Sequence, residues 1–180
     1  NTEDTVIHNI GDSRAVAFSF PSEYDGVCEI KMQTQDHKPD DIDEQTRFRK
    51  LRESGHLKER DLQWDLEDTM LRIDGYGVSR TVGNLNFPNL ICKSDQTIVN
   101  AKEWDVLVMA CDGIWDEIKT SDVVDYIYGE IKKKEKMTSN DFKKIVEGII
   151  KFALDKQSQD NLTVILVLRM NKQKAGISRK

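Results

Sequence analysis

Apolar and alternating segments divide the first part of the chain into short predicted strands. Residues 5–10 and 15–20 are rich in strand-forming residues, and the Gly-Asp-Ser-Arg segment at 11–14 has the chemistry of a tight turn. We therefore predict a β-hairpin with Asp12 at its tip. Apolar and polar side chains alternate over residues 27–34, which indicates a third, half-buried strand.

A helix is predicted next, over residues 42–53. Asp40 or Asp41 can cap its first turn, and Gly55 stands at the position where many helices end. The expected apolar face comprises Ile42, Thr46, Phe48 and Leu51. Residues 56–71 are polar and show no periodicity, so we expect a surface excursion there.

Two further strands are predicted in the second half of the chain. Residues 104–110 form a nearly continuous apolar run, typical of a strand that is buried on both faces. Residues 162–168 form a second apolar run. Asp112 follows the first run and Asp160 precedes the second, so each aspartate is presented at the end of a strand.

Two helices are predicted between these strands. Thr120 or Ser121 opens the first helix, and lysines 132–134 lie at its end, where the helix dipole favours cations. Apolar residues keep a spacing of three and four over residues 139–156, which predicts the second helix. Strands and helices do not alternate strictly, so the fold class is α+β with a mainly antiparallel sheet.

Composition narrows the possible partners. The 180 residues carry 27 basic and 32 acidic side chains, a net charge of −5, which disfavours nucleic acid as the main partner. No apolar run is long enough to span a membrane. The cysteines are odd in number and widely spaced, which favours a reducing, intracellular location, cytoplasmic or nuclear. They are Cys28, Cys92 and Cys111.

Three aspartates share the same predicted context. Asp12 lies in a tight turn, and Asp112 and Asp160 flank buried strands. A carboxylate at the edge of a rigid sheet is well placed to bind Mg²⁺ or Mn²⁺. Each aspartate taken alone is better explained by a local hydrogen bond in a turn, and only their joint occurrence favours a metal site.

Six segments in order along the chain have the character of motifs: Asn9-Ile10-Gly11-Asp12-Ser13-Arg14-Ala15-Val16, Gln35-Asp36-His37-Lys38-Pro39, Glu44 with Arg47 and Gly55, Arg72-Ile73 through Val78-Ser79-Arg80 to Gly83, Ala110-Cys111-Asp112-Gly113-Ile114-Trp115-Asp116, and Asp160-Asn161-Leu162-Thr163-Val164-Ile165. They cover residues 9–165. In this order they resemble the later motifs of a known family, the metal-dependent serine/threonine protein phosphatases of type 2C.

The resemblance implies an α-β-β-α sandwich with a pair of Mn²⁺ or Mg²⁺ ions at one end. Asp112 and Asp160 match metal ligands, and Asp12 matches an aspartate implicated in a weaker third metal site. The implied activity is hydrolysis of phosphoserine or phosphothreonine in phosphoprotein substrates, with a metal-bridging water as nucleophile. The catalytic residues of the general acid–base step stay unassigned.

Two departures from the family pattern qualify this interpretation. The early motifs, in which a Glu-Asp pair accompanies an Asp-Gly-His-Gly-Gly segment and a phosphate-binding arginine, do not occur together in the 180 residues, and no Asp-Gly-His-Gly-Gly segment is present. We expect them on a preceding N-terminal segment of the same domain, without which this chain holds only part of the site. The family usually has Gly-Asp where this chain has Gly83-Asn84, which removes a charge near the site.

The expected organisation is therefore the C-terminal portion of one phosphatase domain over residues 1–170, with a flap-like excursion at 40–76 and a basic tail at 171–180. A monomer is expected. The alternative is an inactive phosphatase-like module that binds a protein partner. A calcium-binding module is disfavoured, because no 12-residue loop has carboxylates at alternate positions.

Four other residues have side chains that could take part in function. His37 precedes Lys38-Pro39 and is interpreted as a packed or capping histidine rather than an acid or base. Arg14 and Arg80 are expected to position turns through carboxylate pairs. Trp115 is expected to pack beneath the Asp112 loop and hold its backbone.

Overall fold

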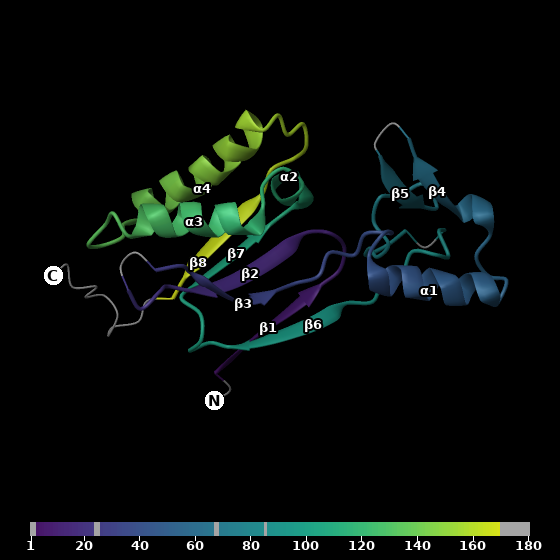
Figure 1. Ribbon diagram of the computed structural model, residues 1–180, viewed down its shortest axis with the longest axis horizontal. Coiled ribbons are helices and arrows are strands. Elements are labelled where there is room, and N and C mark those ends of the chain that lie inside the picture. The colour runs from purple at the N-terminus through teal and green to yellow at the C-terminus, as the bar shows by residue number, and fades with distance from the viewer. Residues whose placement is uncertain (1–2, 24–25, 67–68, 85, 170–180) are drawn as a thin grey trace. The chain divides into compact units, whose positions relative to one another are not determined.

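The computed structural model describes residues 3–23, 26–66, 69–84 and 86–169, and it confirms the α+β class (Figure 1). In chain order the elements are β1 (Asp4–Asn9), β2 (Arg14–Ser19), β3 (Glu29–Gln33), α1 (Ile42–Glu53), the 3-10 helix η1 (Glu59–Asp61), β4 (Leu62–Asp65), β5 (Met70–Ile73), β6 (Asp95–Asn100), β7 (Val106–Ala110), α2 (Asp112–Trp115), α3 (Thr120–Ile131), α4 (Ser139–Asp155) and β8 (Val164–Leu168). The predicted tail at 171–180 lies outside the described residues.

The chain divides into two compact units. Unit 1 comprises residues 1–7, 13–34 and 97–180, and unit 2 comprises residues 8–12 and 35–96. Each unit is described by itself below.

Unit 1 is built on a four-stranded sheet with the order β3-β2-β7-β8, in which every neighbouring pair is antiparallel. Alternate residues of β2 serve two different cores, as the period of a strand requires. Val16 and Phe18 pack with α2, α3 and α4 on one face, while Ala15 and Ala17 join a second cluster on the other. All four are buried, so β2 is an interior strand.

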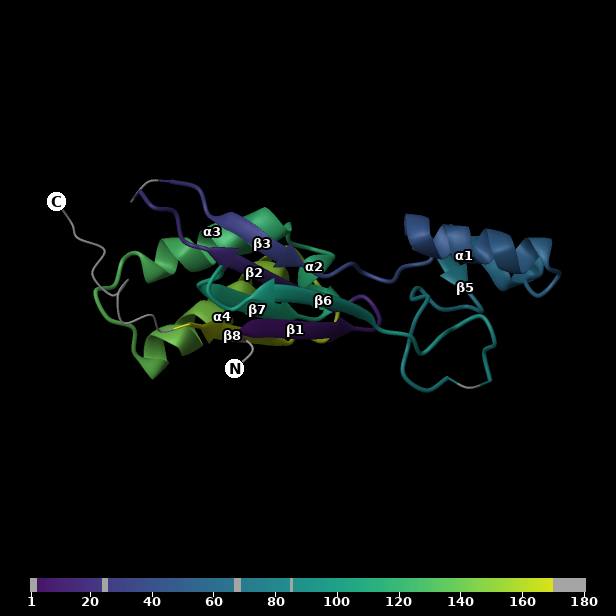
Figure 2. The ribbon, with the colours of Figure 1, turned by 90° about the horizontal axis from the view of Figure 1, so that it is seen from below.

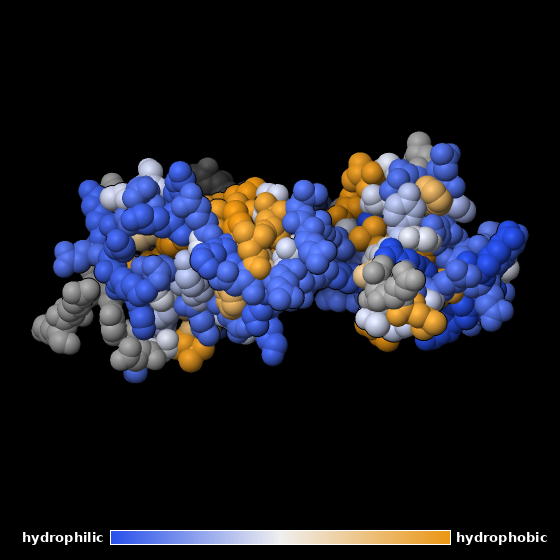
Figure 3. All heavy atoms as spheres, turned by 90° about the horizontal axis from the view of Figure 1, so that it is seen from above, coloured by the Kyte–Doolittle hydropathy of each residue, from blue (hydrophilic) through white to orange (hydrophobic). Residues whose placement is uncertain are grey.

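The two faces of this sheet are covered differently. Helices α3 and α4 lie on one face, and the β1-β6 pair lies on the other (Figures 1 and 2). Ile7 and Val99 from that pair pack on Trp104 and Leu107. The described residues thus form three layers of the implied α-β-β-α sandwich. From the side of α3 and α4, a group of apolar atoms stands out among hydrophilic ones (Figure 3).

The predicted hairpin is wrong in its pairing. Both of its strands form, but β1 pairs with β6, whereas β2 pairs with β3 and β7. Both edges of β2 are occupied by these neighbours, so it has no edge left for β1. The predicted strands at 27–34, 104–110 and 162–168 are confirmed with shorter bounds as β3, β7 and β8.

Helix α1 has the predicted bounds, and its predicted apolar face is confirmed in part, because Phe48 is buried and Leu51 packs against the core that contains it. Asp41 caps it by accepting from the backbone N–H groups of Asp43 and Glu44. Its buried residues are Glu44 and Phe48, while Ile42 is 72% exposed. A buried carboxylate at 44 replaces the expected apolar contact at 42, because two arginines neutralise Glu44.

Residues 56–71 contain regular structure that the pattern did not predict. They include η1 and β4, and β4 pairs with β5 in an antiparallel hairpin that joins Leu62 to Ile73. Ile73 packs with Phe48 in the small core of unit 2. The apolar pattern did not predict this hairpin, because Ile73 is the only fully buried residue of β4 and β5.

Helix α3 begins at Thr120, as predicted, and ends at Ile131, so that lysines 132–134 follow its last turn. Helix α4 confirms the prediction at 139–156 closely. The cap of α3 differs: Lys119 is the N-cap and offers no side-chain hydrogen bond. Thr138 caps α4 by accepting from the N–H of Asp141, whose carboxylate accepts in return from Thr138. This reciprocal pair fixes the first turn of α4.

Candidate metal-binding site

Strand β7 places Asp112 at the edge of the sheet. The strand pairs on both sides, with β2 and β8, so its end is rigid. Asp112 is the first residue of α2 and is half-buried. Its Oδ1 accepts from the N–H of Gly113 at 2.9 Å, which orients the carboxylate.

Strand β8 places Asp160 at the same edge. The residue lies in the loop between α4 and β8 and is exposed. Its Oδ1 accepts from the N–H of Asn161 at 2.6 Å. One carboxylate oxygen of each aspartate is thus held by its own loop.

The two loops are bound to each other through Cys111. Its thiol donates to the carbonyl oxygen of Asn161 at 3.0 Å, and its sulfur accepts from the N–H of Thr163 at 3.2 Å. The N–H of Cys111 also donates to the carbonyl oxygen of Thr163. Ser158 adds a hydrogen bond from Oγ to the carbonyl oxygen of Gly113 at 3.0 Å.

Gly113 allows the loops to approach this closely. A Cβ at this position would lie 2.6 Å from the carbonyl oxygen of Asn161 and 3.1 Å from the Cβ of Asp160. The structure therefore brings Asp112 and Asp160 together as neighbours. The residue pattern did not point to Cys111, Ser158 or Gly113, because their roles depend on contacts across about 45 to 52 residues of chain.

Trp115 supports the Asp112 loop from below, as predicted. It is buried in the main core, and its indole N–H donates to the carbonyl oxygens of Ala110 and Arg14 at 2.9 and 3.1 Å. The guanidinium of Arg14 lies over the indole ring, 5.2 Å from its centroid. Trp115 thereby fixes the end of β7 just before Asp112.

Asp12 belongs to unit 2, in the turn between β1 and β2. The turn requires the left-handed conformation at Gly11, whose φ is +95°. The N–H of Gly11 donates to Nδ1 of His37, and the side chain of Asn9 donates to the carbonyl oxygen of Gly11. His37 is 1% exposed, which confirms its interpretation as a packed histidine.

An ion-pair network continues from His37 through unit 2. The other ring nitrogen of His37 lies 3.0 Å from Asp95, and Arg80 donates to Asp95 at 2.8 Å. Arg80 also binds Glu44 through two N–H groups, at 2.8 and 2.6 Å, and Arg47 binds the second oxygen of Glu44. Arg80 therefore does position its segment through carboxylate pairs, as predicted.

The electrostatics of Glu44 follow from these contacts. Burial of the carboxyl by itself raises its pKa, because it disfavours the charged form. Hydrogen bonds from Arg80 and Arg47 outweigh burial, so the pKa of Glu44 is lowered from 4.5. The carboxylate stays ionised although its side chain is 1% exposed.

The donor set at Asp112 and Asp160 suits Mg²⁺ or Mn²⁺ in chemistry, since both side chains offer hard carboxylate oxygens. It is incomplete in number. Across the part of the chain that the structure describes, no group of three or more His, Cys, Asp and Glu side chains could hold a metal ion. The two aspartates therefore fit as part of a metal site.

Comparison with known proteins identifies the family. The pattern of the family described as Protein phosphatase 2C matches residues 1–162. The chain belongs to the protein phosphatase 2C family. Human "Protein phosphatase 1B" is 26% identical over 180 residues, covering 93% of this chain and 32% of the relative. "Probable protein phosphatase 2C 21" of Arabidopsis thaliana is 28% identical over 173 residues, covering 89% of this chain and 43% of the relative.

Solved structures agree on the fold. A phosphatase from a pathogenic strain of Toxoplasma gondii matches with a TM-score of 0.65 and 26% identity, over 91% of this chain and 47% of that one. A sex-determining protein of C. elegans matches with a TM-score of 0.69 and 20% identity, over 97% of this chain and 39% of that one, and shows the fold alone. The chain thus spans less than half the length of these relatives.

Asn84 and the helices were the subject of two further predictions. Asn84, at the position where the family usually has aspartate, is exposed, has a φ of 55° and donates to Thr81 Oγ1 at 3.3 Å. Within the described ranges, no helix is both long and apolar enough to cross a membrane.

Proposed function

We propose that the protein containing this chain is a metal-dependent phosphatase that hydrolyses phosphoserine or phosphothreonine in protein substrates. The observation that carries the proposal is the pairing of Asp112 and Asp160 at one sheet edge, in a chain of the protein phosphatase 2C family.

Asp112 and Asp160 would hold Mn²⁺ or Mg²⁺ through the carboxylate oxygens that their own loops leave free. When bound, a pair of divalent ions supplies a water nucleophile of low pKa and neutralises the phosphoryl oxygens. The contribution of this chain is to hold the two carboxylates in place. Trp115, Cys111 and Ser158 provide that rigidity through backbone hydrogen bonds.

The remaining ligands would come from a preceding segment of the same domain, with residues 1–170 as its C-terminal portion and residues 40–76 as a flap. Asp12 would serve a weaker third metal position. Unit 1 offers apolar surface for such a segment. Ile165 of β8 and Ile98 of β6 are 52% and 56% exposed, and β8 is the last strand of its described sheet.

We further propose an intracellular, monomeric phosphatase. The three cysteines are free in the structure, which supports a reducing compartment. Cys28 also has a raised thiol pKa, about 11, caused first by burial and then by Asp125 and Asp105. A thiol of this kind is poorly suited to act as a nucleophile.

The test uses the full-length protein. Asp112→Asn and Asp160→Asn should each lower kcat/KM for a phosphothreonine peptide in Mn²⁺ by at least about a hundredfold, or about 2.7 kcal/mol. Calorimetric Mn²⁺ binding should weaken in the same variants. Asp125→Asn, an exposed carboxylate on α3, is the matched control and should change neither quantity. Full activity in either site variant would refute the ligand assignment, and no hydrolysis by the wild type would favour an inactive module.

A further inference from the structure

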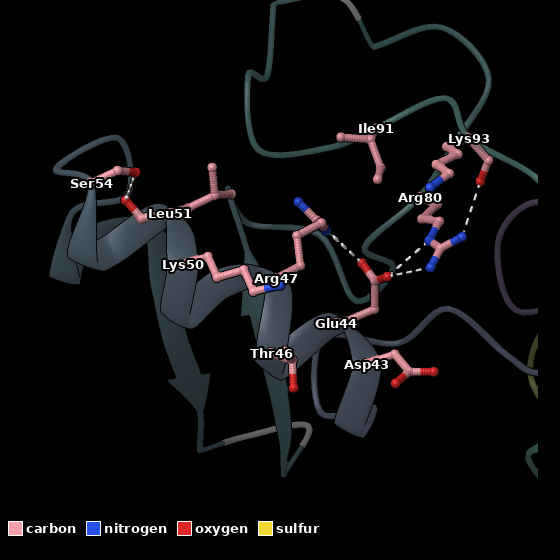
Figure 4. Close-up of a pocket in the computed structure, with 10 residues that line it drawn as sticks. All are labelled: Asp43, Glu44, Thr46, Arg47, Lys50, Leu51, Ser54, Arg80, Ile91 and Lys93. Carbon is pink, nitrogen blue, oxygen red and sulfur yellow. Dashed lines mark hydrogen bonds and ion pairs between the residues drawn. The ribbon is translucent and has the colours of Figure 1, made fainter.

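A pocket of about 430 Å³ lies along α1, wholly within unit 2 (Figure 4). Helix α1 contributes Arg47, Lys50 and Leu51 to its lining, and the segment before β6 contributes Ile91 and Lys93. The pocket therefore combines cations with aliphatic side chains on two separate segments.

The two arginines at the pocket are already occupied. Arg47 donates to Glu44 and to the carbonyl oxygens of Ser79 and Asn89. Arg80 donates to Glu44, to Asp95 and to the carbonyl oxygen of Lys93, as the dashed lines in Figure 4 show in part. Glu44 and Asp95 neutralise the two arginines, and the hydrogen bonds hold both guanidinium groups in fixed positions at the pocket.

The lining cations that remain available to bind a ligand are the two lysines, Lys50 and Lys93. Lys50 and Lys93 are both exposed, and neither makes an ion pair within the described ranges of the chain. Asp43 is the one lining carboxylate outside the arginine network. With the network neutral, the lysines and Asp43 leave one net positive charge.

Two of the lining side chains are aliphatic. They are Leu51 on α1 and Ile91 in the segment before β6, and both are half-buried. Among the described residues, no aromatic side chain lines the pocket, although stacking on aromatic rings is the usual way to bind single-stranded nucleic acid. Aliphatic contact with flanking cations suits a peptide in which carboxylates surround an aliphatic residue.

We propose that this pocket binds an acidic peptide segment, with its carboxylates at Lys50 and Lys93 and an aliphatic side chain against Leu51 and Ile91. Under the proposed function, on which this step rests, the segment belongs to the phosphoprotein substrate. The pocket then selects phosphoprotein substrates that carry a segment of acidic and aliphatic residues.

The test measures binding of a fluorescein-labelled peptide of alternating Glu and Leu to the full-length protein by anisotropy, without metal. Lys50→Gln and Lys93→Gln should each weaken binding about two- to fivefold, as expected of solvent-exposed charge pairs. Asp43→Asn should tighten it by a similar factor. Arg49→Gln removes an exposed cation of α1 outside the pocket lining, and should leave the affinity unchanged.

Peptide controls separate the two recognition elements. Replacing every Glu by Gln should abolish saturable binding, and replacing every Leu by Ala should weaken it. Raising the salt concentration should weaken it as well. Equal binding of the Gln peptide, equal effects of Arg49→Gln and Lys50→Gln, or tighter binding of a single-stranded oligonucleotide through the same lysines would overturn the proposal.

This assay is independent of catalysis. If the full-length protein binds the acidic peptide through Lys50 and Lys93 but hydrolyses no phosphopeptide, the pocket proposal stands and the phosphatase proposal fails. If the full-length protein is active but does not bind the acidic peptide, the pocket proposal fails alone.

Discussion

Substituting Gly113 by alanine tests whether the close approach of the two aspartate loops is required. A methyl group at Gly113 would meet the carbonyl oxygen of Asn161 at 2.6 Å, Leu162 Cδ2 at 3.0 Å and Asp160 Cβ at 3.1 Å. The nearest of these is a backbone atom, which cannot rotate away as the end of a flexible side chain can.

The size of the effect follows from the distances. Ordinary van der Waals contact begins at 3.4 Å, so the Asn161 carbonyl must move by 0.8 Å, the difference between 3.4 and 2.6 Å. Overpacking of this kind costs about 1 to 3 kcal/mol. The same movement lengthens the hydrogen bond from Cys111 to Asn161, worth about 1 kcal/mol. We expect Gly113→Ala to lower the free energy of unfolding by about 2 to 4 kcal/mol.

The assay compares two glycine substitutions in the same unit by urea unfolding, followed by circular dichroism. Gly129 lies inside α3, and a Cβ there meets no atom within 4 Å. Gly129→Ala should therefore stabilise the protein by up to about 1 kcal/mol, through helix propensity alone. Hydrogen exchange of residues 158–163 should rise in Gly113→Ala and stay unchanged in Gly129→Ala.

A neutral or stabilising Gly113→Ala would refute the reasoning. It would mean that the loops separate without cost, and that the contact between the Asp112 and Asp160 loops is not tight in solution. Destabilisation with unchanged exchange at 158–163 would likewise contradict the local cause that we assign.

Three further predictions concern other parts of the chain. Glu44→Gln should destabilise unit 2 by about 3 kcal/mol, since it leaves two arginines without their buried partner, whereas exposed Glu53→Gln should have little effect. Because the folded-state pKa of Glu44 is lowered, its stabilisation is present above about pH 4.5 and is lost as the pH falls through the folded-state pKa, and the Gln variant should lack that loss in acid unfolding curves. Thr138→Ala should cost about 1 kcal/mol in urea unfolding and should raise the pKa of Asp141 from about 2 in an NMR titration, because hydrogen bonds from Thr138 are the first cause of that lowering; an unchanged titration would refute the cap. Cys28, with its thiol pKa near 11, should react with iodoacetamide far more slowly at pH 8 than exposed Cys92, and equal rates by mass spectrometry would contradict its burial.

Local pattern was a good guide where one face of an element is buried. The spacing of three and four in α4 predicted its length closely, and it places Ile145, Ile149 and Ala153 in the core. The apolar runs predicted β7 and β8 for the same reason. A periodic buried face can be recognised in the sequence itself, because most of its positions are apolar.

The local pattern could not predict which strands pair with each other or which side chains form ion pairs. The turn chemistry at 11–14 predicted that β1 and β2 pair with each other, and only the tertiary structure shows that β3 and β7 occupy both edges of β2. Likewise, the apolar face predicted for α1 did not include Glu44, since a buried carboxylate is costly unless cations neutralise it. Those cations come from Arg47 nearby and from Arg80, 36 residues away.

The candidate site divides in the same way. Strand length and burial are local properties, so the apolar runs were enough to place Asp112 and Asp160 at the ends of buried strands. That the two ends are neighbours depends on the antiparallel pairing of β7 with β8 and on the absence of a side chain at Gly113, and these contacts form only in the folded chain. Proximity across nearly fifty residues is a property of the packed chain.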